Sequence, residues 1–289
     1  MAAISRLANY ADLTQILHMD LLLSEIENRA IVRIEGDERQ AFLQNLLTQN
    51  LDVCTPNTCH MAALLTPQGK MAFDFLIYAT HDAYLLDCDS AIVADLMKRL
   101  TLYKLRAKVD ISLLDIGVWA IWQADGQPCP PQDGFYPDPR HAGLGLRGLF
   151  AQKPDVAVTR AASSDWQALR LRLGVPEGHE DMPNGKIFPL EFGLAQMGGV
   201  DFQKGCFVGQ EVTSRTHRKG TLRKKLWPLQ FQQQAPAEGS RIVTAKQRPC
   251  GEIVTASGSQ AIALIREDAL GEELLCEGAA FQRLDGLFS

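Results

Sequence analysis

Apolar and polar positions along the first half of the chain follow two rhythms, one typical of strands and one typical of helices. The stretches with strand character are residues 30–36, 61–66, 71–79, 83–88, 108–115 and 118–124. The turn-forming sequence Pro-Gln-Gly-Lys at 67–70 separates the second stretch from the third. Residues 61–79 are therefore predicted to form a β-hairpin.

Helical patterns interrupt these strands. Asp37 is placed to cap a helix, with Gln40 in the capping-box position, and an apolar stripe continues that helix to about Gln49. A second helix is predicted to start at Ser90 and a third to cover residues 162–175. The order strand, helix, three strands, helix, strand predicts an α+β unit with a largely antiparallel sheet and helices on one face.

The pattern changes in the second half of the chain. Residues 125–145 are rich in Pro, Gly and Asp and are predicted to form an irregular connection. From about residue 221, short β-like runs alternate with turn residues, which is typical of a small barrel. We therefore divide the chain into an α+β body (1–220) and a C-terminal β-barrel (221–289).

Composition narrows the class of protein. The 289 residues carry a net charge of −5, which argues against a dedicated nucleic-acid or membrane-surface binder. Seven cysteines without CxxC spacing argue against a disulfide scaffold, and Cys54, Cys59 and His60 lack a second pair to complete a metal site. The N-terminal residues do not have the layout of a signal peptide, so we expect a cytoplasmic protein without a bound metal.

The sequence KGCFVGQEV at 204–212 is the strongest candidate for chemistry. Gly205 and Gly209 flank Cys206 closely enough to allow a positive φ or a close backbone approach and to leave the thiol accessible. Gln210 and Glu211 are placed to open a helix. The alternative is that Cys206, beside Phe and Val, is a small buried hydrophobe.

Basic residues are dense around and after this loop. Together with Lys204 they would lower the pKa of a nearby thiol if the fold brings them close. They are Arg215, Arg218, Lys219, Arg223, Lys224 and Lys225. Two interpretations remain open: a solvated face, or a site for an anionic ligand such as a polyglutamate tail, a phosphate or RNA.

The loop resembles the hallmark K-G-C-[YF]-x-G-Q-E, followed by Arg, of the folate-binding YgfZ family. Here it is Lys204 to Glu211 with Arg215 four residues later, and Phe207 replaces the more usual Tyr. Further blocks match in order over nearly the whole chain. They include VRIEGDERQAFLQNLLTQNL, LLTPQGKMAFDF, YKLRAKVDI, RLRLGVPEG and IFPLEFGL.

The resemblance implies a fold related to the aminomethyltransferase T-protein of the glycine cleavage system. Two ferredoxin-like lobes of non-contiguous chain and a C-terminal barrel would surround a central channel for tetrahydrofolate or a folate derivative. By this resemblance, Glu191 occupies the place of the T-protein glutamate that binds the pterin. A carboxylate suits this role because it can accept two N–H bonds from the aminopyrimidine edge. A helix cap is its alternative role. The remaining cofactor-binding candidates are Asp74, Arg106 and Arg215.

The resemblance also implies a function in assembly or repair of iron–sulfur clusters in client enzymes, including radical-SAM enzymes that modify tRNA. Cys206 and Lys204 would be the residues responsible for this function. Because one cysteine cannot hold a cluster alone, cluster-assembly proteins and client enzymes would be partners. The alternative is a folate-dependent one-carbon transferase, which needs Asp74 and tolerates loss of Cys206. A folate-binding regulator acting on RNA is a third hypothesis, although we do not expect direct nucleic-acid binding.

Overall fold

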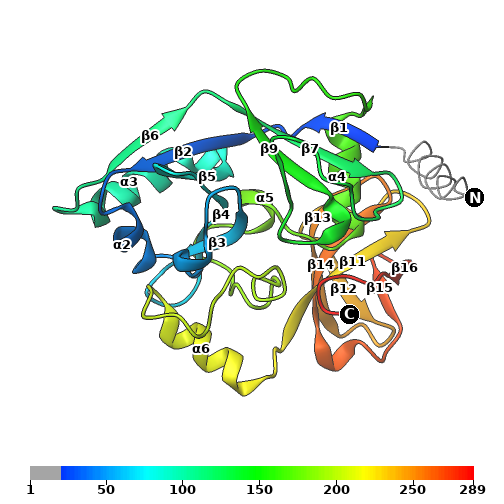
Figure 1. The fold of residues 1–289 in the computed structure, drawn as a ribbon. Coiled ribbons are helices and arrows are strands. Elements are labelled where there is room, and N and C mark those ends of the chain that lie inside the picture. Colours follow the sequence, from blue (N-terminus) through cyan, green and yellow to red (C-terminus); the bar gives the residue numbers. More distant parts are fainter. Residues whose placement is uncertain (1–20) are drawn as a thin grey trace, which may run out of the picture.

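A computed structural model of the protein describes residues 21–289, so the N-terminal residues considered above lie outside the described part. Two sheets and a barrel make up the molecule (Figure 1). All strand pairs in the first sheet are antiparallel. In sheet order its strands are β3 (Cys59–Leu65), β4 (Met71–Ala79), β5 (Ala83–Asp89), β2 (Arg29–Glu35) and β6 (Asp110–Leu114).

The second sheet is built from non-contiguous chain. It takes β1 from before the first sheet and its other strands from after it, and only β1 and β10 run parallel. In sheet order its strands are β10 (Thr159–Arg160), β1 (Leu21–Glu25), β7 (Gly117–Gln123), β9 (Leu146–Phe150) and β8 (Phe135–Pro137). The chain therefore enters the second sheet, builds the first sheet and then returns to the second.

A closed barrel follows at the C-terminal end, to the right in Figure 1. Its closure leaves no unpaired edge, because β16 returns to pair with β11. In barrel order the strands are β11 (Lys224–Phe231), β14 (Gln260–Arg266), β13 (Pro249–Ser257), β12 (Arg241–Thr244), β15 (Leu274–Cys276) and β16 (Ala279–Arg283). The predicted class, an α+β body with a β-barrel, is confirmed.

The helices fill the spaces around these sheets. The apolar stripes of α2 (Arg39–Gln44) and α3 (Val93–Lys104) pack on one face of the first sheet, as predicted. Trp166 of α4 (Ser163–Arg172) packs edge-on against Trp122 of β7, in a core shared with both sheets and the barrel. Two further helices are α5 (Gly178–Asp181) and α6 (Gln210–Lys219), and short 3-10 turns are η1 (Leu51–Val53), η2 (Ser90–Ile92), η3 (Ala142–Leu144) and η4 (Glu267–Ala269).

Several predicted boundaries are wrong for local reasons. The residue before α2 is Glu38, not Asp37, and its carboxylate accepts the N–H of Lys108 instead of capping the helix. Gln40 donates to Asp52, so the capping box does not form. The helix also ends at Gln44 rather than near Gln49, because Thr48 N donates to the carbonyl of Ala63 in β3 and the Gln44 carbonyl accepts from Lys204 Nζ instead.

Two other expectations need correction. Ser90 opens a 3-10 turn capped by the Asp89 carboxylate, and the α-helix itself begins at Val93. The segment 125–145 was expected to be irregular, yet it contains β8, which pairs with β9. Among residues 21–289, no helix combines the length and apolarity needed to cross a bilayer.

Candidate functional site

The cysteine loop lies on the surface at the start of α6. Cys206 is exposed, whereas the other six cysteines, all within residues 21–289, are buried or partly buried. Phe207 beside it is only 6% exposed. The helix begins at Gln210, as predicted. Of the two interpretations of Cys206, the structure thus supports an accessible thiol rather than a core residue.

The two glycines of the loop have different roles. Gly209 has φ +80°, and a Cβ there would lie 2.6 Å from the carbonyl oxygen of Thr66, so both expected reasons for glycine hold. Gly205 has neither. Its φ is not positive, and a Cβ there would meet no atom within 4 Å. The expectation for Gly205 is therefore wrong.

Lys204 points away from solvent. The residue is 8% exposed, and its Nζ donates to the carbonyl oxygens of Gln44, Leu47 and Gln49, each at 2.7 Å. Burial lowers the pKa of Lys204 to about 8. An ammonium group has three N–H donors, and all three are used by these carbonyls.

A cavity of about 300 Å³ lies between α6, the segment 188–191 and the start of the barrel. Glu191 lines it together with Phe188, Leu190, Val212, Lys219 and Arg223. Burial raises the pKa of the Glu191 carboxyl, with Lys224 acting in the opposite direction. The cavity volume is at the lower end of the range for small-molecule sites.

The chemistry of this lining fits a pterin with an anionic tail. The Glu191 carboxylate suits an aminopyrimidine edge, Phe188 is 42% exposed and suits ring stacking, and Lys219 and Arg223 suit carboxylates. A helix-cap role for Glu191 is not supported, because it lies in a series of turns and its carbonyl accepts the N–H of Leu226.

The other three expected folate residues do not line this cavity. Asp74 is 5% exposed on β4, and Gly178 N donates to its Oδ2 at 3.3 Å. Arg106 is exposed between α3 and β6, at the edge of the first sheet opposite β3. Arg215 is exposed on α6 and forms an ion pair with Glu211 at 3.5 Å. The fold therefore does not gather the four residues around one cavity.

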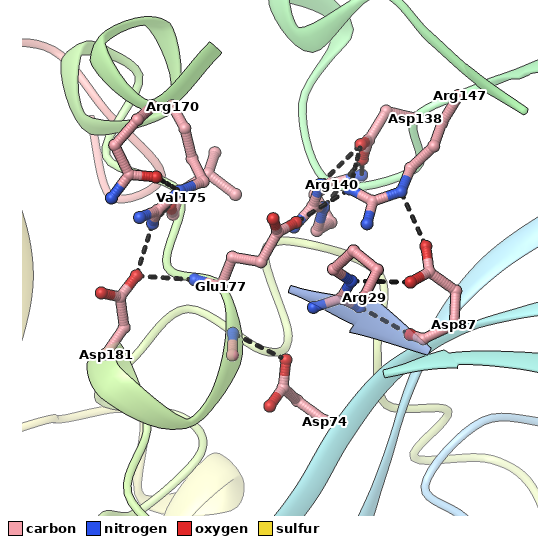
Figure 2. A network of polar contacts seen from close by, with 12 residues as sticks. Arg29, Asp74, Asp87, Asp138, Arg140, Arg147, Arg170, Val175, Glu177 and Asp181 are labelled. Atoms are coloured by element: carbon pink, nitrogen blue, oxygen red, sulfur yellow. Dashed lines mark hydrogen bonds and ion pairs between the residues drawn. The ribbon is translucent and has the colours of Figure 1, made fainter. Parts of the chain in front are cut away.

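A buried ionic network lies where the lobes and barrel meet (Figure 2). Asp87 of β5 accepts from Arg29 Nε and Arg147 Nε, both at 2.7 Å, and so joins the two sheets. Arg147 Nη1 donates to Glu177 Oε2 at 2.8 Å, and Glu177 also forms an ion pair with Arg140. Its other members are Asp138, Arg170 and Asp181, and Thr255 of the barrel donates to Asp181.

Sequence analysis did not identify this network. Burial by itself raises the pKa of Glu177, but the guanidinium groups of Arg147 and Arg140 hold it well below its usual value. One local signal was available: Arg147 lies in the otherwise apolar run GLGLRGLF, where a charged residue needs a buried partner. No group of three or more potential metal ligands occurs among residues 21–289.

The fold is that of a T-protein-like aminomethyltransferase. The structure is similar to that of glycine cleavage system aminomethyltransferase T from Bartonella henselae, with a TM-score of 0.71 over 96% of this chain and 89% of that one. Sequence identity is 13%, so this likeness shows the fold alone. Residues 223–283 match the family model of the CAF17 C-terminal β-barrel domain.

Curated relatives give the family. The mitochondrial iron-sulfur cluster assembly factor IBA57 of Mus musculus is 32% identical, covering 85% of this chain and 77% of the relative. Its Homo sapiens counterpart is also 32% identical, covering 83% and 76%. The chain belongs to this YgfZ-like family of IBA57 iron-sulfur cluster assembly factors. Because these relatives are mitochondrial proteins, our expectation of a cytoplasmic location is wrong.

Proposed function

We propose that this protein assists iron–sulfur cluster assembly through the thiol of Cys206. The observation that carries the proposal is the exposure of this one cysteine at the start of α6, while the other six lie in packed surroundings. Thiolates are the usual protein ligands of iron–sulfur clusters. A single thiol leaves other coordination positions open, so a partner protein or a second copy must supply the remaining ligands.

Complementation tests this role. In a host that lacks its own homologue, the wild-type protein is expected to restore the activity of four-iron enzymes, and Cys206→Ala is expected not to. Cys129→Ala is the matched control, because Cys129 is partly buried and outside the loop. Equal rescue by Cys206→Ala and wild type, at equal amounts of soluble protein, would show that the thiol is dispensable.

The proposal includes a folate ligand, tetrahydrofolate or a derivative, in the cavity lined by Glu191. Its support is the lining itself: a half-buried carboxylate, an exposed aromatic ring and two cations. Calorimetry with tetrahydrofolate is expected to show binding that Glu191→Ala weakens by about tenfold or more, the loss typical of one charged hydrogen-bond partner. Glu252→Ala, an exposed barrel residue, is the control. Unchanged affinity in Glu191→Ala would remove the proposed pterin contact.

We further propose that the clients include radical-SAM enzymes that modify tRNA. This part rests on the family resemblance of the KGC loop and the accompanying blocks. Thiolation of tRNA is expected to fall in the deletion host and to return with wild-type protein but not with Cys206→Ala. Normal tRNA thiolation in the deletion host would remove these enzymes from the clients while leaving the assembly role intact.

A folate-dependent one-carbon transferase is the second candidate, favoured by the T-protein fold. Asp74 is the residue it needs, yet Asp74 is buried and does not line the Glu191 cavity. Asp74→Asn separates the two functions, because a transferase would lose activity whereas a cluster-assembly factor would still complement.

A further inference from the structure

The environment of Lys204 connects two distant parts of the chain. Its ammonium donates to three carbonyl oxygens in the segment 44–49, which begins at the last residue of α2 in the first lobe. Other hydrogen bonds join the same two segments. Thr48 Oγ1 donates to the carbonyl of Gly199 at 2.6 Å, and Asp201 N donates to the carbonyl of Thr48 at 3.0 Å.

The chain on the other side of Cys206 is also held. Phe207 is buried in the central core, and the Lys204 Nζ lies 5.6 Å from its ring centroid. Gly209 packs its backbone against Thr66 in the turn of the β3–β4 hairpin. Only Gly205 and Cys206 lie between Lys204 and Phe207. The thiol is therefore exposed, while the residue before this pair is held by the first lobe and the residue after it by the central core.

We propose that Lys204 is a positioning residue whose ammonium fixes the Cys206 loop to the 44–49 segment, so that the thiol is presented in one place to a partner. This inference rests on the proposed function of Cys206. A shared cluster requires the thiol to meet ligands from another molecule at defined geometry. A loop that is already ordered does not lose conformational entropy when the partner binds.

The geometry argues against direct chemistry by Lys204. Its three N–H donors all point to main-chain carbonyls, and the side chain is nearly inaccessible to solvent. A group in this position is not free to transfer a proton to an incoming reactant. Its effect on the thiol must pass through the loop backbone, which is what separates a positioning residue from a catalytic one.

Hydrogen exchange of the isolated protein tests this role without any cluster or partner. Lys204→Met keeps the length of the side chain and removes its donors. The exchange rate of the amides of residues 199–207 is therefore expected to rise by about tenfold or more relative to wild type, while the exchange rate of the barrel amides stays unchanged. Lys98→Met, an exposed lysine on α3, is the control and should change neither region. Unchanged exchange in the loop of Lys204→Met would overturn the proposal.

A second variant protects the test if Lys204→Met does not fold. Thr48→Val removes the hydroxyl that donates to Gly199, so it loosens the same junction from the other side, and it also removes the acceptor of the Ala63 N–H on β3. It should raise loop exchange by a smaller factor than Lys204→Met does, and because it also leaves the buried Ala63 N–H unpaired, loop exchange is compared with barrel exchange in the same variant. Equal rises in the loop and the barrel would indicate global destabilisation and would also overturn the proposal.

Cluster reconstitution with iron, sulfide and glutathione then separates the two hypotheses. The visible absorption of the cluster should be lost in Cys206→Ala, whose loop exchange stays like wild type, and reduced in folded Lys204→Met, whose thiol is intact. If Cys206→Ala binds a cluster normally, the proposed function fails while loop anchoring is still judged by exchange. If Lys204→Met loses the cluster with a fully protected loop, Lys204 acts on the chemistry and positioning is wrong.

Discussion

At the scale of single residues, Asp74 is a buried carboxyl close to the ionic network. Four arginines of the ionic network, Arg29, Arg140, Arg147 and Arg170, face the four carboxylates of Asp87, Asp138, Glu177 and Asp181. Ionised Asp74 would add a fifth negative charge. Burial raises its pKa above the ordinary value despite the attraction of Arg29. With Asp74 in its neutral form, the four guanidinium groups would face four carboxylates.

This argument predicts the pH dependence of stability in Asp74→Asn. A folded-state pKa above the unfolded value means that native Asp74 binds more protons, so its contribution to stability is lost as pH rises through the folded pKa. Asn does not titrate and still accepts the N–H of Gly178. The variant should therefore gain stability relative to wild type from acidic to neutral pH. Urea unfolding at both pH values measures this, and a stability difference between variant and wild type that stays constant or shifts against the variant as pH rises would contradict it.

At the scale of elements, α6 depends on how the backbone enters it. The helix follows Gly209, whose left-handed φ of +80° turns the chain past the β3–β4 hairpin. Acidic Glu211 lies in the first turn and His217, Arg218 and Lys219 in the last, an order that complements the helix dipole. Local sequence was sufficient to predict where this helix begins.

The two loop glycines give a matched prediction for this element. Gly209→Ala should destabilise the protein by roughly 2 kcal/mol, because alanine is strained at this φ and its Cβ would be 2.6 Å from a main-chain oxygen. Gly205→Ala meets no atom within 4 Å, so its effect should stay within about 0.5 kcal/mol. Urea unfolding of both variants measures the difference. Equal losses of unfolding free energy would contradict the left-handed conformation of Gly209 and its close contact with Thr66.

At the scale of the whole molecule, the ionic network determines how the lobes and barrel meet. Asp87 and Arg147 come from different sheets (Figure 2). Asp181 receives a hydrogen bond from Thr255 of the barrel. Both charged side chains of the Asp87–Arg147 pair are fully inaccessible to solvent. Such a pair adds little net stability but is costly to break, because the remaining charge is left unpaired in the interior.

Arg147→Met is therefore expected to lower the free energy of unfolding by about 3–5 kcal/mol, since Asp87 and Glu177 both lose a partner. The control is Arg248→Met, whose ion pairs with Asp268 and Glu272 are exposed and should change stability far less. Urea unfolding with intrinsic tryptophan fluorescence measures both. A loss in Arg147→Met no larger than that in Arg248→Met would mean that the network does not join the lobes.

The sequence by itself determined the elements whose signals are local. The 61–79 hairpin has two stretches of strand character joined by a turn sequence. Helix α6 starts after a glycine, and the barrel has short strands separated by turns. The motif blocks also indicated the family and the cysteine loop. These features succeed because hydrophobic periodicity and turn chemistry depend on neighbouring residues.

Only the tertiary structure decided which groups meet across the chain. Lys204 binds carbonyls 155 to 160 residues away, and Arg147 binds Asp87 across 60 residues. No local pattern shows that a lysine close to an exposed cysteine turns inward, or that Asp74 and Glu191 lie in separate surroundings. The physical reason is that the partner of a buried charge is set by the packing of whole lobes, which a short stretch of sequence does not contain.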